Sequence, residues 1–587
     1  MMESEGSRNE ITVASHEYLN CDFSDVVFSW SLEDIFNENL FKHKVQNIPE
    51  TFQSVGQYFG SFVYPLLEET RTQLCSSLET IEEAPYAEIV GLEESKSMPY
   101  RYGTQLYNVK VDEWRNRFSG WKEPYKTLPG DVLILADAKP ESASDLQRMG
   151  RMWTFLLVTK IPDEDKDEDE NEDEDEDEDE IGYRHFDFQV EASRDNHHMK
   201  KSLFMIFLIN IIPSKRIWNS LHKRGNLKII NEVLCTNSVV EENCQLCVQK
   251  GGIWYEKICP NLSSTLNYSQ VEAVMTCLAR INCNHKSNVD LIWGPPGTGK
   301  TKTVGMLLFT LFKMKRKTLV CAPTNVAIKE VASRVMKLMK ESYGADSGRD
   351  AMFCPLGDIL LFGNKDRLKV GDEVEEIYMD YRLKRLKKYF KSTTHWKQCF
   401  NSMIDVLKDC VSQYHIFLKK SNGKSMSFLE FVREELKCAA TQLRNCLFVF
   451  YTHIPKSIIL EHNLQKVLSF ISLLDSFEPL LLHENVDPEE LEELFSHPVE
   501  DFSELITDTD RKYLLQQRRS ECYFALKCLM DSLNSCNLPS VLNQKSLMGK
   551  ASLIFCTASS AYKLRSVAME SLNILVIDEA AQLRESF

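Results

Sequence analysis

The stretch GPPGTGKT, residues 294–301, decides which fold this chain of 587 residues contains. It matches the pattern G-x-x-x-x-G-K-[S/T], whose glycines let backbone N–H groups curl around phosphate oxygens. The apolar run Val289 to Trp293 precedes it and predicts a strand, and Lys300 to Phe312 follows it and predicts a helix. Strand, glycine loop and helix in this order predict a nucleotide site. Its residues are Gly294, Pro295, Pro296, Gly297, Thr298, Gly299, Lys300 and Thr301.

A second stretch, ILVIDEAA at residues 574–581, supplies the carboxylates that nucleotide hydrolysis requires. An apolar strand that ends in two carboxylates places them at the carboxyl edge of a sheet, where α/β folds bind ligands. We expect Lys300 to reach the β- and γ-phosphates and Thr301 to offer its hydroxyl to magnesium. Asp578 is the expected second magnesium ligand, and Glu579 is expected to polarise the attacking water.

Strand and helix patterns alternate around these two stretches. Apolar runs predict further strands at Thr318 to Ala322, Ser552 to Cys556 and Asn573 to Ile577, and Val326 to Met339 predicts a helix. This alternation predicts a parallel sheet with helical crossovers. We assign residues 260–345 and 549–587 to this α/β domain.

The intervening stretch, residues 346–548, has a helical pattern. Leu460, Leu464, Val467, Ile471 and Leu474 fall on one face of a helix. Such stripes are typical of packing surfaces in a helical bundle, and nothing in them indicates cofactor binding. Further helices are predicted at residues 373–389, 403–418, 428–450 and 512–533.

The N-terminal half divides into three parts. Residues 1–100 are mixed and mainly helical, and residues 101–213 show short apolar runs between turn residues, which predict a small β-barrel or sheet. Residues 214–259 form a linker or helical stalk. The most apolar run, Leu203 to Ile212, is too short for a bilayer, which needs about 20 residues, so we interpret it as a buried strand.

An acidic run, residues 163–180, dominates the charge of the chain. It holds 16 carboxylates, whereas the net charge of the whole chain is -17, so the remainder is close to neutral. Self-repulsion and the lack of apolar residues predict a disordered loop. The run is either a docking segment for basic partners, a mimic of nucleic acid, or a solvated spacer, and the spacer is the commoner case.

The motifs form one ordered set: LNYSQ at residues 266–270, the glycine loop, CAPTNVA at residues 321–327 and DEAA at residues 578–581. The set resembles superfamily 1 nucleic-acid helicases of the senataxin and regulator-of-nonsense-transcripts type, especially plant senataxin-like helicases. This resemblance implies a RecA-like P-loop NTPase fold with a helical insertion, preceded by a β-barrel. It assigns the adenine to Gln270 and single-stranded nucleic acid to Pro323, Thr324, Asn325 and Thr557.

The resemblance also implies the activity: an ATP- and magnesium-dependent helicase acting on RNA or DNA, with a nuclear location favoured over a cytoplasmic one. Eight residues follow Glu579, whereas the family continues into a second RecA-like domain that supplies arginines to the transition state. Such an arginine is worth about 10³ to 10⁵ in rate. The expectation for this chain alone is ATP binding with very slow hydrolysis and no unwinding.

Four alternatives stay open at this point. The chain could be a non-catalytic interaction protein whose barrel, acidic run and helical insertion bind partners, or a ring-forming remodelling ATPase. Thr324 and Thr557 could simply cap helices. Cys235, Cys244, Cys247 and Cys259 contain a single CxxC pair with irregular wider spacing, which favours structural thiols over a zinc site.

Overall fold

The structure is a computed structural model. It divides into two compact units, residues 1–240 with 584–587 and residues 241–583. The residues that it describes are 18, 20–49, 51–96, 103–115, 125–148, 153–161, 186–193, 203–222, 264–281, 289–347, 354–390, 395–420, 426–483, 486–499, 511–536, 538–569 and 572–583.

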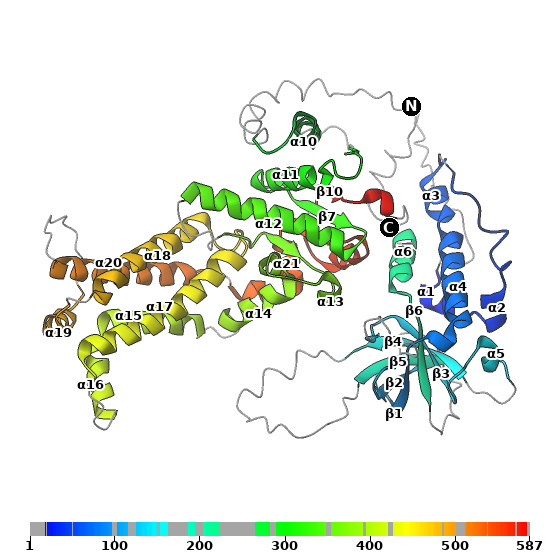
Figure 1. The fold of residues 1–587 in the computed structure, drawn as a ribbon, viewed down its shortest axis with the longest axis horizontal. Coiled ribbons are helices and arrows are strands. Elements are labelled where there is room, and N and C mark those ends of the chain that lie inside the picture. Colours follow the sequence, from blue (N-terminus) through cyan, green and yellow to red (C-terminus); the bar gives the residue numbers. More distant parts are fainter. Residues whose placement is uncertain are drawn as a thin grey trace, which may run out of the picture. The chain divides into compact units, whose positions relative to one another are not determined.

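The first unit contains a closed β-barrel, which confirms the predicted barrel. The strands follow the order β1-β2-β5-β4-β3-β6, and all neighbouring pairs are antiparallel (Figure 1). The first strand begins ahead of residue 101, where the sequence placed the start of the barrel. The strands are β1 (Tyr86–Glu94), β2 (Thr104–Val111), β3 (Asp131–Ala136), β4 (Trp153–Lys160), β5 (Phe186–Ser193) and β6 (Phe204–Asn210).

The barrel is closed around an apolar interior. Every residue of β3 is buried, and Leu133 and Leu135 pack inside against Val190 and Met205. The run predicted as a buried strand at Leu203 to Ile212 forms β6. The acidic run falls in the connection between β4 and β5 and lies outside the described residues.

Helices pack on the outside of the barrel. Ser31 begins α2 with a capping box, because its side chain accepts from the backbone of Asp34 while the Asp34 carboxylate accepts from the backbone of Ser31. Leu66, Leu74 and the other buried residues of α4 join those of α1, α2 and α6 in one core with β3 and β6. The helices are α1 (Phe23–Phe28), α2 (Leu32–Phe36), α3 (Val55–Ser61), α4 (Val63–Glu79), η1 (Ile81–Glu83), α5 (Ala143–Leu146) and α6 (Ile212–His222).

The second unit is built on a parallel sheet of four strands in the order β10-β7-β9-β8. The predicted strands at residues 318–322, 552–556 and 573–577 are present, whereas β8 is short and was not predicted. Parallel pairing brings the carboxyl ends of all four strands to one edge of the sheet. The strands are β7 (Thr318–Ala322), β8 (Ile359–Leu361), β9 (Leu553–Thr557) and β10 (Ile574–Ile577).

Helices cover both faces of this sheet. Alternate side chains of the strands, among them Val320 and Phe555, pack against α11 and α12. The other set, among them Ile554 and Cys556, packs against α14, α21 and η5. The helices of this α/β part are α10 (Tyr268–Ile281), α11 (Lys300–Lys313), α12 (Asn325–Ser347), α13 (Lys365–Leu368), η3 (Glu375–Ile377), α21 (Gln544–Lys550), η5 (Ala558–Ser566) and η6 (Ala580–Gln582).

The prediction of a strand at Val289 to Trp293 is wrong for this structure. All five residues are described, and none belongs to a strand. Four of the five are apolar, but Leu291 and Trp293 are 87% and 90% exposed. A strand forms only where a neighbouring strand satisfies its backbone groups, and β10 pairs with β7 on one edge only among the described residues.

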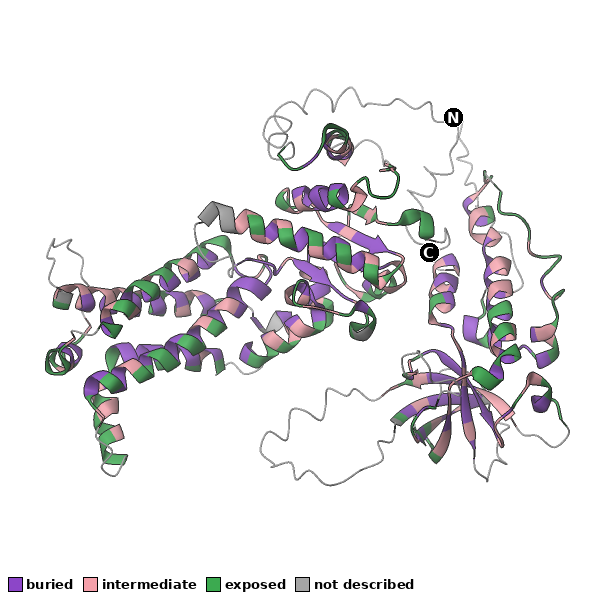
Figure 2. Cartoon of the chain, in the orientation of Figure 1, coloured by how far each residue is buried: buried purple, intermediate pink, exposed green. Residues whose placement is uncertain are grey.

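A helical bundle is inserted between β8 and β9. Its helices turn their buried faces toward one another and their exposed faces outward (Figure 2), and they share one apolar core. In the described part of the chain, no helix combines the length and apolar character that crossing a bilayer requires. The helices are α14 (Met379–Phe390), α15 (His395–Lys408), α16 (Cys410–Lys420), α17 (Phe428–His453), α18 (Glu461–Leu482), α19 (Pro488–Ser496), α20 (Arg511–Asn534) and η4 (Leu538–Val541).

The bundle is joined to the sheet through a buried polar junction at the end of α17. Arg382 is fully buried and donates to the carbonyl oxygens of Leu356 and Gly357, just ahead of β8. His453, also fully buried, places Nε2 3.1 Å from Oε2 of Glu376. Because these buried groups cannot exchange their partners for water, they hold the bundle in a fixed orientation against the edge of the sheet.

The junction predicts acid sensitivity. Burial lowers the pKa of His453 from its ordinary value of 6.5, and the charges of Arg382 and Arg385 act in the same direction, against the attraction of Glu376. The unfolded chain therefore binds the proton first as the pH falls. The neutral His453 ring contributes its full share to the free energy of unfolding above pH 6.5. This share is lost as the pH falls toward the pKa of His453 in the folded protein, by at most about 1.4 kcal/mol per pH unit.

Thermal melting between pH 7.5 and 5 checks this prediction. His453→Gln is expected to flatten the acid loss, and His462→Gln, a change at an exposed histidine, is expected to leave it unchanged. Equal pH slopes in the wild type and His453→Gln would show that another group causes the acid loss.

Candidate nucleotide and nucleic-acid site

The glycine loop has the backbone that a phosphate cradle requires. Gly297 and Gly299 have φ angles of 81° and 83°, in the left-handed region that favours glycine. A Cβ on Gly299 would also stand 2.9 Å from Nε2 of Gln270. Lys300 and Thr301 follow as the first two residues of α11, so the N-terminal dipole of that helix points at the loop.

Lys300 is held inside its own loop. Its Nζ donates to the carbonyl oxygens of Gly294 at 2.7 Å and Pro295 at 3.0 Å. Thr298 closes the same turn, because its hydroxyl donates to the Pro295 carbonyl at 2.8 Å. The ammonium group is thus positioned over the space that the loop encloses.

Gln270 is in contact with the glycine loop. Its Nε2 donates to the carbonyl oxygen of Thr298 at 3.0 Å, and its Oε1 accepts from the backbone N–H of Asn267 at 3.1 Å. The side chain therefore links the start of α10 to the glycine loop. A side chain held in this way can stand beside a base whose phosphates occupy the loop.

Asp578 lies where β10 ends, and its backbone N–H continues the sheet by donating to the Cys321 carbonyl at 2.9 Å. Burial raises the pKa of its carboxyl. The negative charges of Glu579 and Glu330 also raise that pKa, whereas the charge of Lys300 lowers it. The two motifs are 278 residues apart in sequence, yet the charge of Lys300 acts on the Asp578 carboxyl.

Gln582 was not predicted as a site residue, yet its side chain binds the carboxylate of Glu579. Gln582 Nε2 donates to Glu579 Oε2 at 2.6 Å, and Glu579 itself has a φ of 52°, uncommon for a side chain of its kind. The signal was in the sequence, since a residue three positions on returns to the same side of a helical turn. Glu330 on α12 was also missed, because only the fold brings it near Asp578.

These groups fit magnesium-ATP in chemical type. Magnesium prefers hard oxygen ligands and retains several waters, and one hydroxyl with one carboxylate is a donor set of that kind. Thr301 and Asp578 carry oxygens of that kind. The loop carries backbone N–H groups and one ammonium group, which are the donors that phosphates accept.

The residues predicted for nucleic acid lie at the carboxyl ends of β7 and β9. Thr324 caps α12, since its hydroxyl accepts from the backbone N–H of Ala327 at 3.2 Å. Thr557 is buried, and its hydroxyl donates to Ser560 at 2.8 Å. Both hydroxyls are therefore engaged within the protein, but only Thr324 makes the bond that the capping alternative proposed, since Thr557 precedes η5 without a side-chain capping bond. Pro323 and Asn325 are half-buried beside them.

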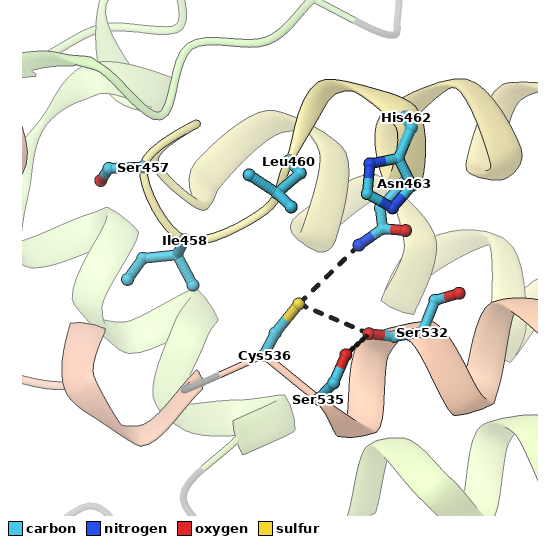
Figure 3. A pocket seen from close by; sticks show the side chains of 8 residues that line it. All are labelled: Ser457, Ile458, Leu460, His462, Asn463, Ser532, Ser535 and Cys536. Atoms are coloured by element: carbon cyan, nitrogen blue, oxygen red, sulfur yellow. Dashed lines mark hydrogen bonds between the residues drawn. The ribbon is translucent and has the colours of Figure 1, made fainter.

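A separate hollow of about 360 Å³ lies in the helical bundle, between the start of α18 and the end of α20 (Figure 3). Asn463 Nδ2 faces Cys536 Sγ across it at 4.0 Å. None of the predicted site residues lines it. The lining residues are Ser457, Ile458, Leu460, His462, Asn463, Ser532, Ser535 and Cys536.

The cysteines considered for zinc, Cys235, Cys244, Cys247 and Cys259, lie outside the described residues. Among the residues that the structure does describe, no group of three or more His, Cys, Asp or Glu side chains is arranged to hold a metal.

Fold and site together define the class of this protein: a P-loop NTPase with a large helical insertion in its parallel sheet. The comparison with protein families agrees. An AAA domain model matches residues 265–586, and a domain of unknown function (DUF6469) matches residues 19–241. The chain belongs to this AAA domain family, among superfamily 1 helicases of the regulator-of-nonsense-transcripts and senataxin type.

Each of the curated relatives matches about a quarter of the chain or less. The DNA-binding protein SMUBP-2 of Rattus norvegicus is 39% identical over 163 residues, 26% of this chain. The regulator of nonsense transcripts 1 homolog of Arabidopsis thaliana is 31% identical over 131 residues, or 22%. The ATP-dependent helicase NAM7 of Saccharomyces cerevisiae is 42% identical over 129 residues, or 20%. The matched segments span 14%, 8% and 12% of those proteins.

Proposed function

We propose that this chain binds magnesium-ATP in the loop at residues 294–301 and couples that binding to single-stranded RNA or DNA, as a helicase-family ATPase. The observation that carries the proposal is the backbone of the glycine loop, in which Gly297 and Gly299 have φ angles of 81° and 83° and Lys300 and Thr301 begin α11. Asp578 follows β10, which pairs with β7, and would supply the carboxylate that magnesium needs.

Each residue then has a role in the proposed site. Lys300 pairs with the β- and γ-phosphates, and Thr301 and Asp578 hold magnesium. Glu579, oriented by Gln582, polarises the attacking water. Gln270 stands beside the adenine, where an amide can both donate and accept. Residues 323–325 and the turn after Thr557 face the nucleic-acid backbone.

The names of the relatives support the partner class. One is called a DNA-binding protein, another a regulator of nonsense transcripts and a third an ATP-dependent helicase. The strand ends of β7 and β9 form the edge at which such a partner would lie. A nuclear location is part of the same proposal.

The test is nucleotide binding by the purified chain, measured with a fluorescent ATP analogue with and without magnesium and single-stranded RNA. Magnesium is expected to tighten binding to the wild type and to give no gain in Asp578→Asn, which keeps the shape of the side chain and removes its charge. A chain that is folded by circular dichroism and binds no nucleotide would overturn the proposal.

A further inference from the structure

The short loop after β8 stands at the same sheet edge as the predicted nucleic-acid contacts. β8 pairs with β9 in parallel, from Ile359 opposite Leu553 to Leu361 opposite Phe555. The residues that follow β8 therefore emerge beside the residues that follow β9. The carboxyl ends of β7, β9 and β8 therefore lie in a row along one edge of the sheet, and neighbouring strands are about 4.8 Å apart.

The loop is fixed to the neighbouring helix. Lys329 on α12 donates to the carbonyl oxygen of Lys369 at 2.7 Å. A Cβ on Gly363 would stand 3.8 Å from Oδ1 of Asn325, so the loop begins beside that predicted contact residue. Helices α12 and α13 accordingly lie next to one another (Figure 1). The loop is thus a rigid part of the edge.

The fold also fixes which side chains the loop presents. Leu368 is 2% exposed and packs under the loop, and the Asn364 side chain accepts from the backbone of Arg367 at 2.9 Å. Lys365 and Arg367 are exposed, and among the side chains that the structure describes, which do not include that of Asp366 between them, no carboxylate forms an ion pair with either. Two exposed cations therefore face solvent from an anchored turn.

We propose that Lys365 and Arg367 bind the phosphate backbone of single-stranded nucleic acid and extend its path from β7 and β9 across the end of β8. The inference rests on the proposed function, because it lengthens the same binding edge. Two positive charges on a rigid turn suit a polyanion, and phosphate contacts position a strand without reading its sequence. RNA and DNA share that chemistry, so both are expected to use the contact.

The experiment measures fluorescence anisotropy of labelled single-stranded RNA and DNA on the full chain at several salt concentrations. In Lys365→Ala/Arg367→Ala, binding to either strand is expected to weaken about tenfold at low salt. The slope of log affinity against log salt is expected to become shallower by about 1.4, since each phosphate contact on a single strand contributes about 0.7.

Two further variants separate charge from structure. Lys419→Ala/Lys420→Ala removes the same charge from the exposed end of α16 and is expected to keep wild-type affinity and slope. Lys365→Arg/Arg367→Lys keeps both charges and is expected to restore binding. ATP affinity serves as the check that the alanine variant is folded.

The outcomes distinguish this inference from the proposed function. If the wild type binds and the Lys365→Ala/Arg367→Ala variant matches it in affinity and slope, the loop contact is wrong and the proposed function stands. If the folded wild type binds neither strand, both are overturned. Weakening with one strand type only supports the contact and identifies that strand as the partner.

Discussion

Replacing Lys300 with alanine is expected to weaken ATP binding by at least about 100-fold, or ~2.8 kcal/mol, while the chain stays folded. The ammonium group donates to two carbonyl oxygens of its own loop and is the positive charge nearest to where the phosphates would lie. Without this ammonium group, the backbone N–H groups of the loop are the only donors left in the loop for the triphosphate of ATP. Titration with a fluorescent ATP analogue in magnesium buffer measures the loss.

A matched control shows that the loss belongs to the site. Lys337 lies on α12, where its exposed side chain pairs loosely with Glu341 at 3.9 Å. Such a surface pair contributes little, so Lys337→Ala should bind ATP as the wild type does. Equal ATP affinity in Lys300→Ala and the wild type would mean that the nucleotide occupies another site, and the assignment of residues 294–301 would be wrong.

The sequence predicted those parts of the fold whose signals are local. The glycine loop, α11 and β7 follow one another within 29 residues, and each carries its own pattern. The segment Val289 to Trp293 is an equally clear apolar run, yet it forms no strand, because an apolar run alone cannot supply a neighbouring strand. The three residues of β8 were missed because they are too few to show a period and lie inside a helical stretch.

The site residues also divide into those with a local sequence signal and those without one. Lys300 and Asp578 could be paired from sequence on the expectation that both motifs lie at the carboxyl edge of one sheet; in the structure Asp578 follows β10, whereas the described residues just ahead of the glycine loop form no strand. The capping bond of Thr324 could be anticipated, since any threonine at such a place can make one, whereas the bond from Thr557 to the Ser560 side chain depends on the turn after β9. Glu330 and the pair Lys365 and Arg367 carry no motif, since their position depends on how α12 and β8 pack.

Gly357→Ala is expected to destabilise the second unit by about 3 kcal/mol, which lowers its melting temperature by roughly 6–12 °C. A Cβ at this position would stand 2.1 Å from the carbonyl oxygen of Ile454. That atom is backbone at the end of α17, and Leu356 next to Gly357 donates its N–H to the Thr452 carbonyl at 3.0 Å. The overlap therefore cannot be relieved by rotating a side chain.

Gly371→Ala is the matched control, because it adds the same methyl group to the same unit. Its Cβ would meet only the ends of two flexible side chains, Glu373 Oε2 at 3.4 Å and Lys329 Nζ at 3.7 Å. The loss of unfolded-state entropy then dominates, and stability is expected to stay level or rise by about 0.4–1 kcal/mol. If both variants melt with the wild type, α17 is not held against the β8 edge, and the buried contacts of Arg382 and His453 cannot join the bundle to the sheet.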